Sequence, residues 1–383
     1  MASNSTKLIA ALPDDWRAGR FVGRIDRGEG PCPILVENGQ VFDMSRVAPT
    51  VSALLAGGVV EAAQGEMLGE LADLDLSPEQ GATNRLLSPI DLQCVKAAGV
   101  TFAVSALERV IEERARGDHA KAAGLRATLE EALGGNIRSV VPGTAEAAQL
   151  KDALIAEGLW SQYLEVAIGP DAEIFTKSPV LSTVGWGMPV GVRSDSTWNN
   201  PEPEVVLVAD AHGRAVGATL GNDVNLRDFE GRSALLLGKA KDNNASCSLG
   251  PLVRLFDDGF TMDDVRSSEV KLTITGTDGY VLEGASSMDQ ISRDPEDLLG
   301  QALSEHHYPD GFILFLGTLF APVQDRDTPG RGFTHKIGDV VTIRSPRLGA
   351  LVNRVTTSKD APPWTMGIGA LMTNLSRRGL LAD

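Results

Sequence analysis

The sequence predicts a mixed α/β fold that is mainly β, in which a barrel or rolled sheet carries a block of helices. Three observations favour this fold class. Short β-branched runs separated by Gly, Pro, Asn and Asp follow one another from about residue 164 to residue 346. Helical spacing of apolar residues is concentrated between residues 105 and 160, and residues 20–44 again contain strand-like runs. Many short strands with few helices are typical of a barrel or a rolled sheet.

The first 85 residues are expected to form a small α+β domain. Strand-like runs at residues 20–26 and 32–44 are accompanied by Asn38-Gly39, a pair that favours a tight hairpin turn. The apolar spacing predicts helices at residues 50–57 and 62–74.

The rest of the chain, residues 86–383, is expected to form one larger domain. Residues 73–91 are polar and contain Pro and Gly, so they are interpreted as a linker. The helical block is expected to be an insertion at about residues 109–158, with a second helix starting at Thr144. Among the later strands, one helix is expected, at residues 295–307.

Composition and charge exclude several classes of protein. The 43% of hydrophobic residues suffices for a sizeable core, and the net charge of −16 argues against nucleic acid as a partner. The start of the chain has too short an apolar stretch for a signal peptide or a membrane span. The three cysteines lack Cys-x-x-Cys spacing, so they are expected to be free thiols. We therefore expect a cytoplasmic protein without a membrane partner.

Three carboxylates are expected to converge at one end of a predicted hairpin, residues 204–220. A two-residue turn at His212-Gly213 would make the numbers of paired residues sum to 425, which places Glu202 opposite Asp223. Glu204 lies on the same face as Glu202, because side chains repeat every two residues along a strand. Carboxylates this close repel one another, and a hard divalent cation with oxygen ligands, such as Mg²⁺, removes the repulsion.

The pattern Glu-x-Glu also has a simpler interpretation, a solvated acidic strand end, which is the favoured one when the pattern stands alone. Pro201 and Pro203 weaken the hairpin locally, because neither can donate a hydrogen bond to the ladder. The surrounding motifs decide between these interpretations.

An ordered set of motifs resembles the fumarylacetoacetate hydrolase superfamily. These motifs are EIFTKSP, the Glu-x-Glu strand, NDVNLRD, GKAKDNNASCSLGP, FLGT and FTHKIGDVVTIRSPRLGALVNRV, spread over about residues 88–356. The resemblance implies a β-roll catalytic domain in which Glu202, Glu204 and Asp223 bind Mg²⁺, with Mn²⁺ as a possible substitute, and the metal binds a 2-oxo acid.

The same resemblance implies roles for further residues. Lys241 matches an active-site lysine, because Ala-Ser-Cys follows four residues later. Lys177 matches a substrate-side lysine, and Gly317 and Thr318 match a Gly-Thr pair that contacts the bound oxo acid. Lys241 is the expected base, and we expect burial near a cation to move its pKa toward neutrality.

One motif of the hydrolytic members is absent. Those members carry His-x-x-Glu at the start of the domain to activate water, whereas here Ser105 and Glu108 stand at these positions. Serine alone cannot serve as that base. Glu108 is therefore expected to protonate a leaving hydroxyl and Ser105 to contact substrate, while the insertion closes over the metal or contacts another subunit.

Together with residues 12–51, these features are similar to a branch of the superfamily that dehydrates 2-keto-3-deoxy sugar acids. The resemblance implies Mg-dependent conversion of a 2-keto-3-deoxy-D-pentonate to 2,5-dioxopentanoate by a hydro-lyase that is a homodimer or homotetramer. Two alternatives remain open: hydrolysis of an acylpyruvate or diketo acid, and non-catalytic binding of a metal and a sugar acid.

Overall fold

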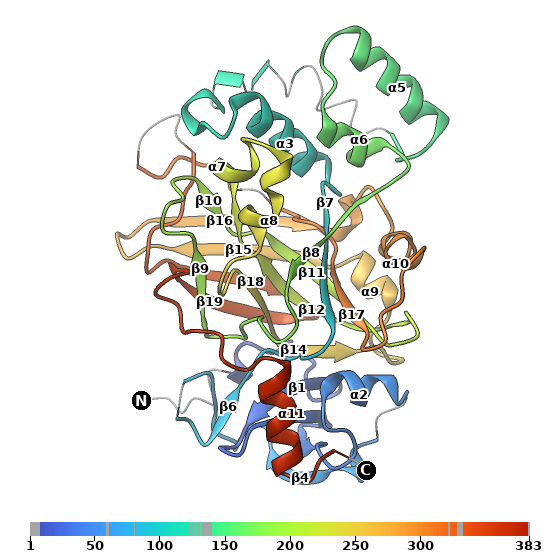
Figure 1. Ribbon diagram of the computed structural model, residues 1–383, viewed down its shortest axis with the longest axis vertical. Coiled ribbons are helices and arrows are strands. Elements are labelled where there is room, and N and C mark those ends of the chain that lie inside the picture. Colours follow the sequence, from blue (N-terminus) through green and yellow to red (C-terminus); the bar gives the residue numbers. More distant parts are fainter. Residues whose placement is uncertain are drawn as a thin grey trace.

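The computed structural model of the chain describes residues 8–58, 61–79, 81–122, 124–125, 127–128, 131, 140–320, 322–327 and 332–381. Strands form the centre and lower part of the molecule, and a group of helices lies at the upper end (Figure 1). The structure is mixed α/β and rich in strands, which confirms the predicted fold class.

The larger sheet runs from the lower end of the molecule into its centre. In spatial order its strands are β4 (Glu66–Glu70), β3 (Gln40–Asp43), β2 (Pro31–Glu37), β1 (Arg20–Asp26), β14 (Cys247–Leu255), β12 (Ala215–Asp223), β11 (Pro203–Ala209), β17 (Phe312–Phe315), β7 (Cys94–Gly99) and β8 (Glu173–Ser178). Strands β11 and β14 are buried along their whole length, because both faces of the sheet are covered.

The smaller sheet packs against the larger one and closes the central core. Its order is β16 (Val281–Ser287), β15 (Glu269–Thr275), β18 (Val340–Ser345), β19 (Gly349–Thr357) and β9 (Pro189–Val192). Alternate residues of β15 are buried, as expected for a strand with one face on the core. Leu272 and Ile343 of this sheet share a hydrophobic cluster with Val205 and Leu220 of the larger sheet.

The N-terminal strands confirm one local prediction. Glu37 pairs with Gln40 across a turn in which Asn38 and Gly39 have φ values of 52° and 80°, the left-handed values that this turn requires. Strand β1 pairs with β14, so these strands extend the larger sheet. The division of the chain at residue 85 stays a prediction.

The region after α2 (Val51–Ala56) differs from expectation. The helix predicted at 62–74 is wrong: one 3₁₀ turn (Ala62–Gln64) is followed by strand β4, which pairs with the edge of β3. Gly69 has a φ of 140°, a value outside the helical region, and the free edge of β3 offers the hydrogen bonds that a strand needs. The expected linker also contains two short strands, β5 (Leu76–Ser77) and β6 (Asn84–Leu86), and β6 pairs with β1.

The helical block at the upper end includes α3 (Ala103–Ala115) and α5 (Ala145–Ala156), which overlap the expected insertion, and α6 (Gln162–Ile168), which follows it. Thr144 caps α5 as predicted, since its hydroxyl accepts from the N–H of Ala147. Residues 129–130 and 132–139 of the expected insertion lie outside the described residues.

More helices interrupt the later strands than the single one expected. Besides α10 (Pro295–Leu303), they are α7 (Arg227–Glu230), α8 (Leu237–Lys241), α9 (Met262–Arg266) and α11 (Ile368–Arg377). Helices α7, α8 and α9 have only four or five residues, which is too short for helical periodicity to reveal them.

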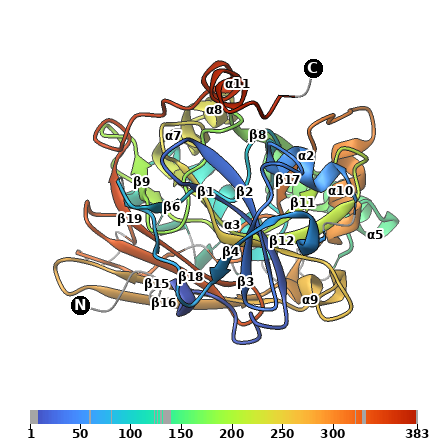
Figure 2. The ribbon, with the colours of Figure 1, turned by 90° about the horizontal axis from the view of Figure 1, so that it is seen from below.

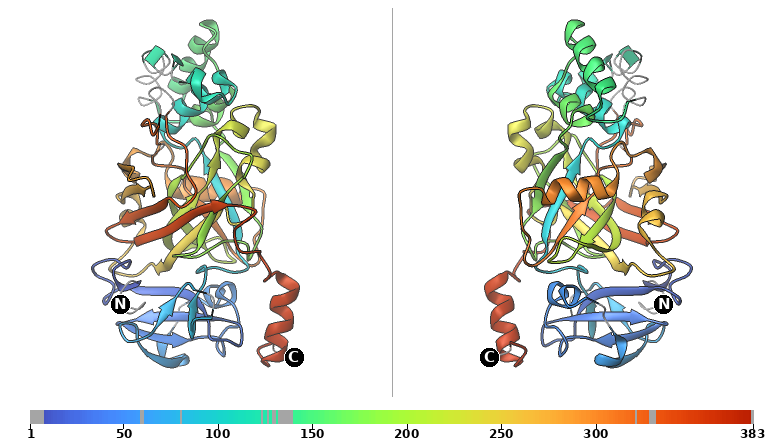
Figure 3. Two further views of the ribbon diagram at one scale, coloured as in Figure 1. Left: turned by 90° about the vertical axis from the view of Figure 1, so that its left-hand side faces the viewer. Right: turned by 90° about the vertical axis from the view of Figure 1, so that its right-hand side faces the viewer.

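The C-terminal helix α11 lies beside the N-terminal strands, as the side views show (Figure 3). The side chain of Asn374 donates to the carbonyl of Glu29 at 2.6 Å, and Arg378 donates to the carbonyl of Pro31 at 2.8 Å. Seen from below, α11 and the smaller sheet lie on opposite sides of the molecule (Figure 2). Within the described residues, no helix has the length and apolar character that crossing a membrane requires.

Candidate active site

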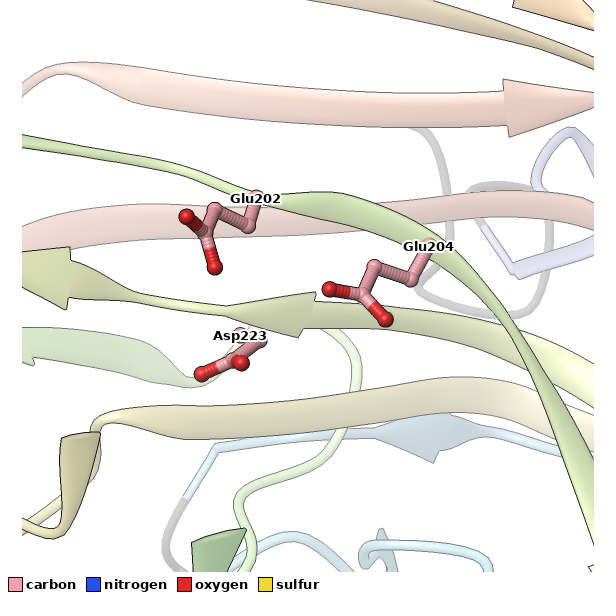
Figure 4. A group of neighbouring side chains, drawn as sticks. All are labelled: Glu202, Glu204 and Asp223. Carbon is pink, nitrogen blue, oxygen red and sulfur yellow. The ribbon is translucent and has the colours of Figure 1, made fainter. Parts of the chain in front are cut away.

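The three expected carboxylates meet where strands β11 and β12 come together (Figure 4). Pro203 pairs with Asn222, which is the predicted register, and the N–H of Asp223 donates to the carbonyl of Glu202 at 3.0 Å. One carboxylate oxygen from each of Glu202, Glu204 and Asp223 lies within 4.8 Å of the others. All three residues are at most 3% exposed, so the interpretation as a solvated strand end is wrong.

The far end of this hairpin differs from the predicted two-residue turn at His212-Gly213. Ala209 pairs with Ala215, one step out of the register, because a bulge precedes Ala209. The Asp210 carboxylate accepts from the N–H of Arg214 at 3.0 Å, which stabilises the longer loop. The bulge lies at the loop, so the register at the carboxylate end is unaffected.

A small cavity surrounds the three carboxylates, and its charges are unbalanced. Among the described residues, five carboxylate and two cationic side chains line it: Glu173, Glu202, Glu204, Asp223, Glu230, Arg109 and Lys241. Burial, and then the charges of Asp223 and Glu202, raise the pKa of Glu204 well above its ordinary value. Oxygen ligands with an excess of negative charge suit a hard divalent cation, so the residues present fit Mg²⁺ or Mn²⁺.

Lys241 ends helix α8 and points at two of the three carboxylates. Its ammonium group contacts Glu202 Oε2, and it contacts Asp223 Oδ2 at 2.9 Å. Burial alone would lower the pKa of Lys241, but Asp223, Glu202 and Glu230 raise it above its ordinary value. Nearby carboxylates thus outweigh burial in this arrangement; the expected move of the pKa of Lys241 toward neutrality assumed a cation beside it and stays a prediction.

Lys177 lies on the other side of Asp223 and is fully buried. Its ammonium group contacts Asp223 Oδ1 at 2.7 Å and donates to the carbonyls of Val224, at 3.1 Å, and Lys241. These three contacts use all three ammonium protons. In this arrangement Lys177 orients Asp223 and the end of helix α8, and it is absent from the described residues that line the cavity.

Helix α3 contributes Arg109, which the sequence analysis missed. Its guanidinium contacts Glu202 Oε1, Glu112 Oε2 at 2.6 Å and Glu230 Oε2 at 3.1 Å. Arg109 thus connects the helical insertion to a candidate metal ligand and to helix α7. Arg109 shares a helix face with Ser105 and Glu112, which lie four and three residues away, and this spacing was the signal available in the sequence.

Glu108, the expected acid, lies outside the described lining of the cavity. Its carboxylate is 3.8 Å from the guanidinium of Arg227, and that guanidinium also donates to Asn200 at 2.9 Å. Asn200 belongs to β10 (Asn199–Asn200), which pairs with β13 (Asn225–Leu226). These contacts give Glu108 a place in the network that joins α3 to α7.

Glu173, the first residue of β8, lines the cavity and was also missed. Burial and the neighbouring charge of Glu230 raise the pKa of Glu173 to about 7. A carboxyl group with such a pKa can hold or release a proton near neutral pH. The motif EIFTKSP begins with this residue, but nothing in the motif favoured it over Lys177.

Ser105, Gly317 and Thr318 take different positions. The hydroxyl of Ser105 donates to the carbonyl of Phe102 at 2.8 Å and accepts from its N–H at 3.2 Å, so it closes the first turn of α3. Gly317 donates its N–H to Glu204 Oε2 at 2.7 Å. Thr318 and Ser105 line the cavity, whereas Gly317 is absent from its described lining and orients the Glu204 carboxylate through its N–H.

The backbone at Gly317 requires glycine. Its φ is 102°, and a Cβ atom there would lie 1.9 Å from Thr101 Oγ1. The close approach of these two segments places the Gly317 N–H against Glu204.

Comparisons with known proteins agree with this geometry. Residues 165–356, half of the chain, match the family model for the fumarylacetoacetate (FAA) hydrolase C-terminal domain. The chain therefore belongs to this family. It is 31% identical over 186 residues to a 2-dehydro-3-deoxy-D-arabinonate dehydratase of Saccharolobus solfataricus, covering 48% of this chain and 58% of that protein.

A second relative, a probable 2-keto-3-deoxyxylonate dehydratase of Haloferax volcanii, is 32% identical over 195 residues, or 51% of this chain and 64% of that protein. The chain thus matches less than two thirds of the length of either relative. A solved 2-keto-3-deoxy-D-arabinonate dehydratase, complexed with magnesium and 2,5-dioxopentanoate, superposes with a TM-score of 0.62 at 23% identity, covering 88% of this chain and 99% of that chain. At this identity the likeness shows the fold.

Proposed function

We propose that this protein is a Mg²⁺-dependent hydro-lyase that converts a 2-keto-3-deoxy-D-pentonate to 2,5-dioxopentanoate. The observation that carries the proposal is the buried triad of Glu202, Glu204 and Asp223 in contact with Lys241. The curated relatives at 31% and 32% identity, both named as dehydratases of such acids, favour the same substrate class.

The candidate ligands define the part that a metal would play. Glu202, Glu204 and Asp223 would hold the cation, and Mn²⁺ is a possible substitute for Mg²⁺. When bound, the cation would polarise the substrate ketone, which makes the C3 protons acidic, and take up the negative charge that raises the pKa of Lys241.

The chain's own residues would move the protons. Lys241 would accept a proton from C3, since its amino group contacts the carboxylates that would hold the cation. Glu173 lines the same cavity with a raised pKa, so we propose that it protonates the hydroxyl that leaves from C4 as water. A proton then moves from C5 to C3, and the hydroxyl proton of the resulting C4–C5 enol moves to C4, which gives the aldehyde. Thr318 lines the cavity, where it would contact the oxo acid.

Ser105 favours dehydration over hydrolysis of an acylpyruvate. Both hydrogen bonds of its hydroxyl go to the backbone of Phe102, so it is not held as a base that activates water. Glu108, its partner in the expected pair, interacts with Arg227.

Incubation with Mg²⁺ and each C4 enantiomer of a 2-keto-3-deoxy-pentonate tests the proposal, with formation of 2,5-dioxopentanoate as the readout. We expect EDTA to abolish the reaction and Mg²⁺ or Mn²⁺ to restore it. Pyruvate release from an acylpyruvate, without 2,5-dioxopentanoate from either enantiomer, would indicate the hydrolase instead. Turnover of neither class would indicate a binding protein.

Deuterium exchange at C3, followed by NMR, tests the base. Lys241→Ala is expected to slow the exchange by about 10²- to 10⁴-fold, the usual loss for a positioned base. The exposed neighbour Lys239 provides the matched control, Lys239→Ala, which should exchange at the wild-type rate. Wild-type exchange in Lys241→Ala would exclude Lys241 as the base.

A cytoplasmic location and a homodimeric or homotetrameric state belong to the proposal as well. They rest on the lack of basic and membrane-type features in the sequence and on the resemblance to the family. Size-exclusion chromatography with light scattering measures the oligomeric state directly.

A further inference from the structure

A second cavity, separate from the carboxylate site, lies between the N-terminal strands and the segment that leads to α11. Its volume is about 480 Å³, within the range of small-molecule sites. Much of the wall is apolar and includes Leu86, Leu181, Met188, Trp364 and Met366. A site with this wall suits a ligand with an apolar body.

A buried cation lines the same cavity. Arg24 of β1 is 6% exposed, and its Nε donates to the carbonyl of Ser88 at 3.2 Å. Its Nη1 is buried, and no hydrogen-bond partner for it occurs in the described part of the chain. Asp91, which attracts it, is occupied by three backbone N–H groups around helix α2 and Leu92. A buried guanidinium with unused donor capacity is a ready site for a carboxylate.

The acidic residues of the cavity wall do not supply the acceptor that Arg24 Nη1 lacks. Glu79 is exposed, so water screens its charge. Asp26 accepts the N–H groups of Gly28 and Gly30, at 2.9 Å and 3.1 Å, within its own turn. Arg85 adds a second cation to the wall, and its buried Nε has no hydrogen-bond partner among the described residues.

The cavity also touches the loop that follows Lys241. Asn244 lines it, and the Asn244 amide donates to the carbonyls of Ser358 and Pro362, at 3.1 Å and 3.3 Å. At the other end of the loop, the Ser246 hydroxyl donates to the carbonyl of Lys241 at 2.8 Å. A short hydrogen-bonded loop thus joins Asn244 to the lysine at the carboxylate site.

We propose that this cavity binds a small organic monocarboxylate with an apolar body at Arg24, and that its occupancy alters the loop from Lys241 to Ser246. The carboxylate would complete the guanidinium hydrogen bonds, and the apolar body would pack against Trp364 and the leucines. The site goes beyond the proposed dehydration, since it lies outside the carboxylate cavity.

Calorimetric titration with benzoate tests the binding, with benzamide as the neutral analogue. Benzoate is expected to bind in the millimolar range or tighter, and benzamide about tenfold more weakly, because a charge-assisted hydrogen bond is lost. Arg24→Met should weaken benzoate about tenfold. Arg27→Met, on the same segment but outside the lining, is the matched control and should bind as the wild type does.

Two further variants remove ambiguous results. Trp364 is 46% exposed, so Trp364→Ala should fold and weaken benzoate even if Arg24→Met does not fold. Glu204→Gln should leave benzoate binding unchanged, because the carboxylate site is elsewhere. Absence of benzoate binding, equal binding of benzamide, or loss of binding in Glu204→Gln would each overturn the site.

Hydrogen exchange tests the coupling without any assay of activity. Benzoate is expected to slow amide exchange in the segment from Lys241 to Ser246 in the wild type and not in Arg24→Met. Binding without a change in this segment would overturn the coupling and leave the site. Because none of these measurements needs turnover, their failure is distinguishable from failure of the proposed dehydration.

Discussion

Two buried groups of charged side chains differ in how their charges are matched. Arg326 and Asp339 face each other with contacts of 2.6 Å and 2.7 Å, and both side chains are at most 1% exposed. Around Glu202, Glu204 and Asp223, by contrast, five carboxylates and two cations line the cavity in the described part of the chain, and Lys177 adds a third cation at Asp223. A matched pair serves the fold, whereas an unmatched cluster costs stability until another cation joins it.

The pKa values follow this difference. Burial raises the pKa of Asp339, but contacts with Arg326 and His335 lower it to about 2. Burial and neighbouring carboxylates together raise the pKa of Glu204 well above its ordinary value. The comparison teaches that burial alone does not distinguish structure from function; the balance of charge around the buried group does.

The largest effect is expected from neutralising a candidate ligand. Glu202→Gln, Glu204→Gln and Asp223→Asn should each lower kcat/KM by more than about 10³-fold, because losing one electrostatic group alone costs about 10²- to 10³-fold. Isothermal titration with Mg²⁺ should show weakened binding, and circular dichroism a retained fold. Full activity of any one variant at limiting Mg²⁺ would remove that residue from the ligand set.

The matched pair should respond in the opposite way. Asp339→Asn is expected to lower the free energy of unfolding by about 3–5 kcal/mol, because it removes the buried carboxylate of Arg326 and leaves it the exposed Asp278. Urea denaturation at neutral pH measures this loss. The kcat/KM of the folded variant should stay near the wild-type value, since Asp339 is outside the carboxylate cavity.

The pH dependence of stability sharpens the same prediction. The pKa of Asp339 is lowered on folding, so its contribution is present above its unfolded pKa of about 4 and lost as the pH falls toward 2. Asp339→Asn should lack this part of the acid-induced loss. Asp278→Asn, at an exposed partner of Arg326, is the control and should cost much less. Equal losses in both variants would contradict the comparison.

Glu173 offers a smaller and more diagnostic effect. Glu173→Gln should lower kcat by about 10²-fold, near the lower end for loss of a general acid. In the wild type, kcat should fall as the pH rises through about 7, because Glu173 then loses its proton. The pH profile of Glu173→Gln should lack this descending limb above pH 7. If Glu108→Gln removes the limb and Glu173→Gln keeps it, Glu108 is the acid, as the sequence first indicated.

The smallest expected effect is on stability at the unmatched cluster. Without Mg²⁺ at pH 7, Glu204→Gln should raise the free energy of unfolding by about 1 kcal/mol or more, because it removes one of the buried, repelling carboxylates. At an Mg²⁺ concentration of a hundred times Kd, the free energy of unfolding of the wild type should rise by about 2.7 kcal/mol. The rise should be smaller in Glu204→Gln. Thermal unfolding with and without Mg²⁺ measures both; destabilisation of metal-free Glu204→Gln would contradict the comparison.

Local patterns explain which parts of the site were predictable. Glu202, Glu204 and Asp223 lie within one hairpin, so strand alternation and the register place them without knowledge of the rest of the fold. Arg109 and Glu173 reach the cavity from α3 and from β8, and only the packing of distant segments brings them there. The charge that keeps Lys241 protonated depends on the same packing, so its pKa could not be inferred from sequence.

The fold shows the same limit. The Asn38-Gly39 turn and the Thr144 cap were predictable, because each depends on neighbouring residues. Strand β4 was mistaken for a helix, because the edge of β3 overrides the local apolar spacing. Helices α7 and α8 carry Glu230 and Lys241 and are too short to show a period.

The contact between Arg109 and Glu202 indicates which segments of the chain must be present together for the carboxylate site to form. The family match covers residues 165–356, but helix α3 and strand β7 lie before it. A fragment cut at those bounds would lack the guanidinium that orients Glu202, and it would leave β17 and β8 without the strand that joins them. The segment that the family model matches is therefore smaller than the unit able to assemble the carboxylate site, and any transplant of this site into another scaffold must carry α3 and β7 with it.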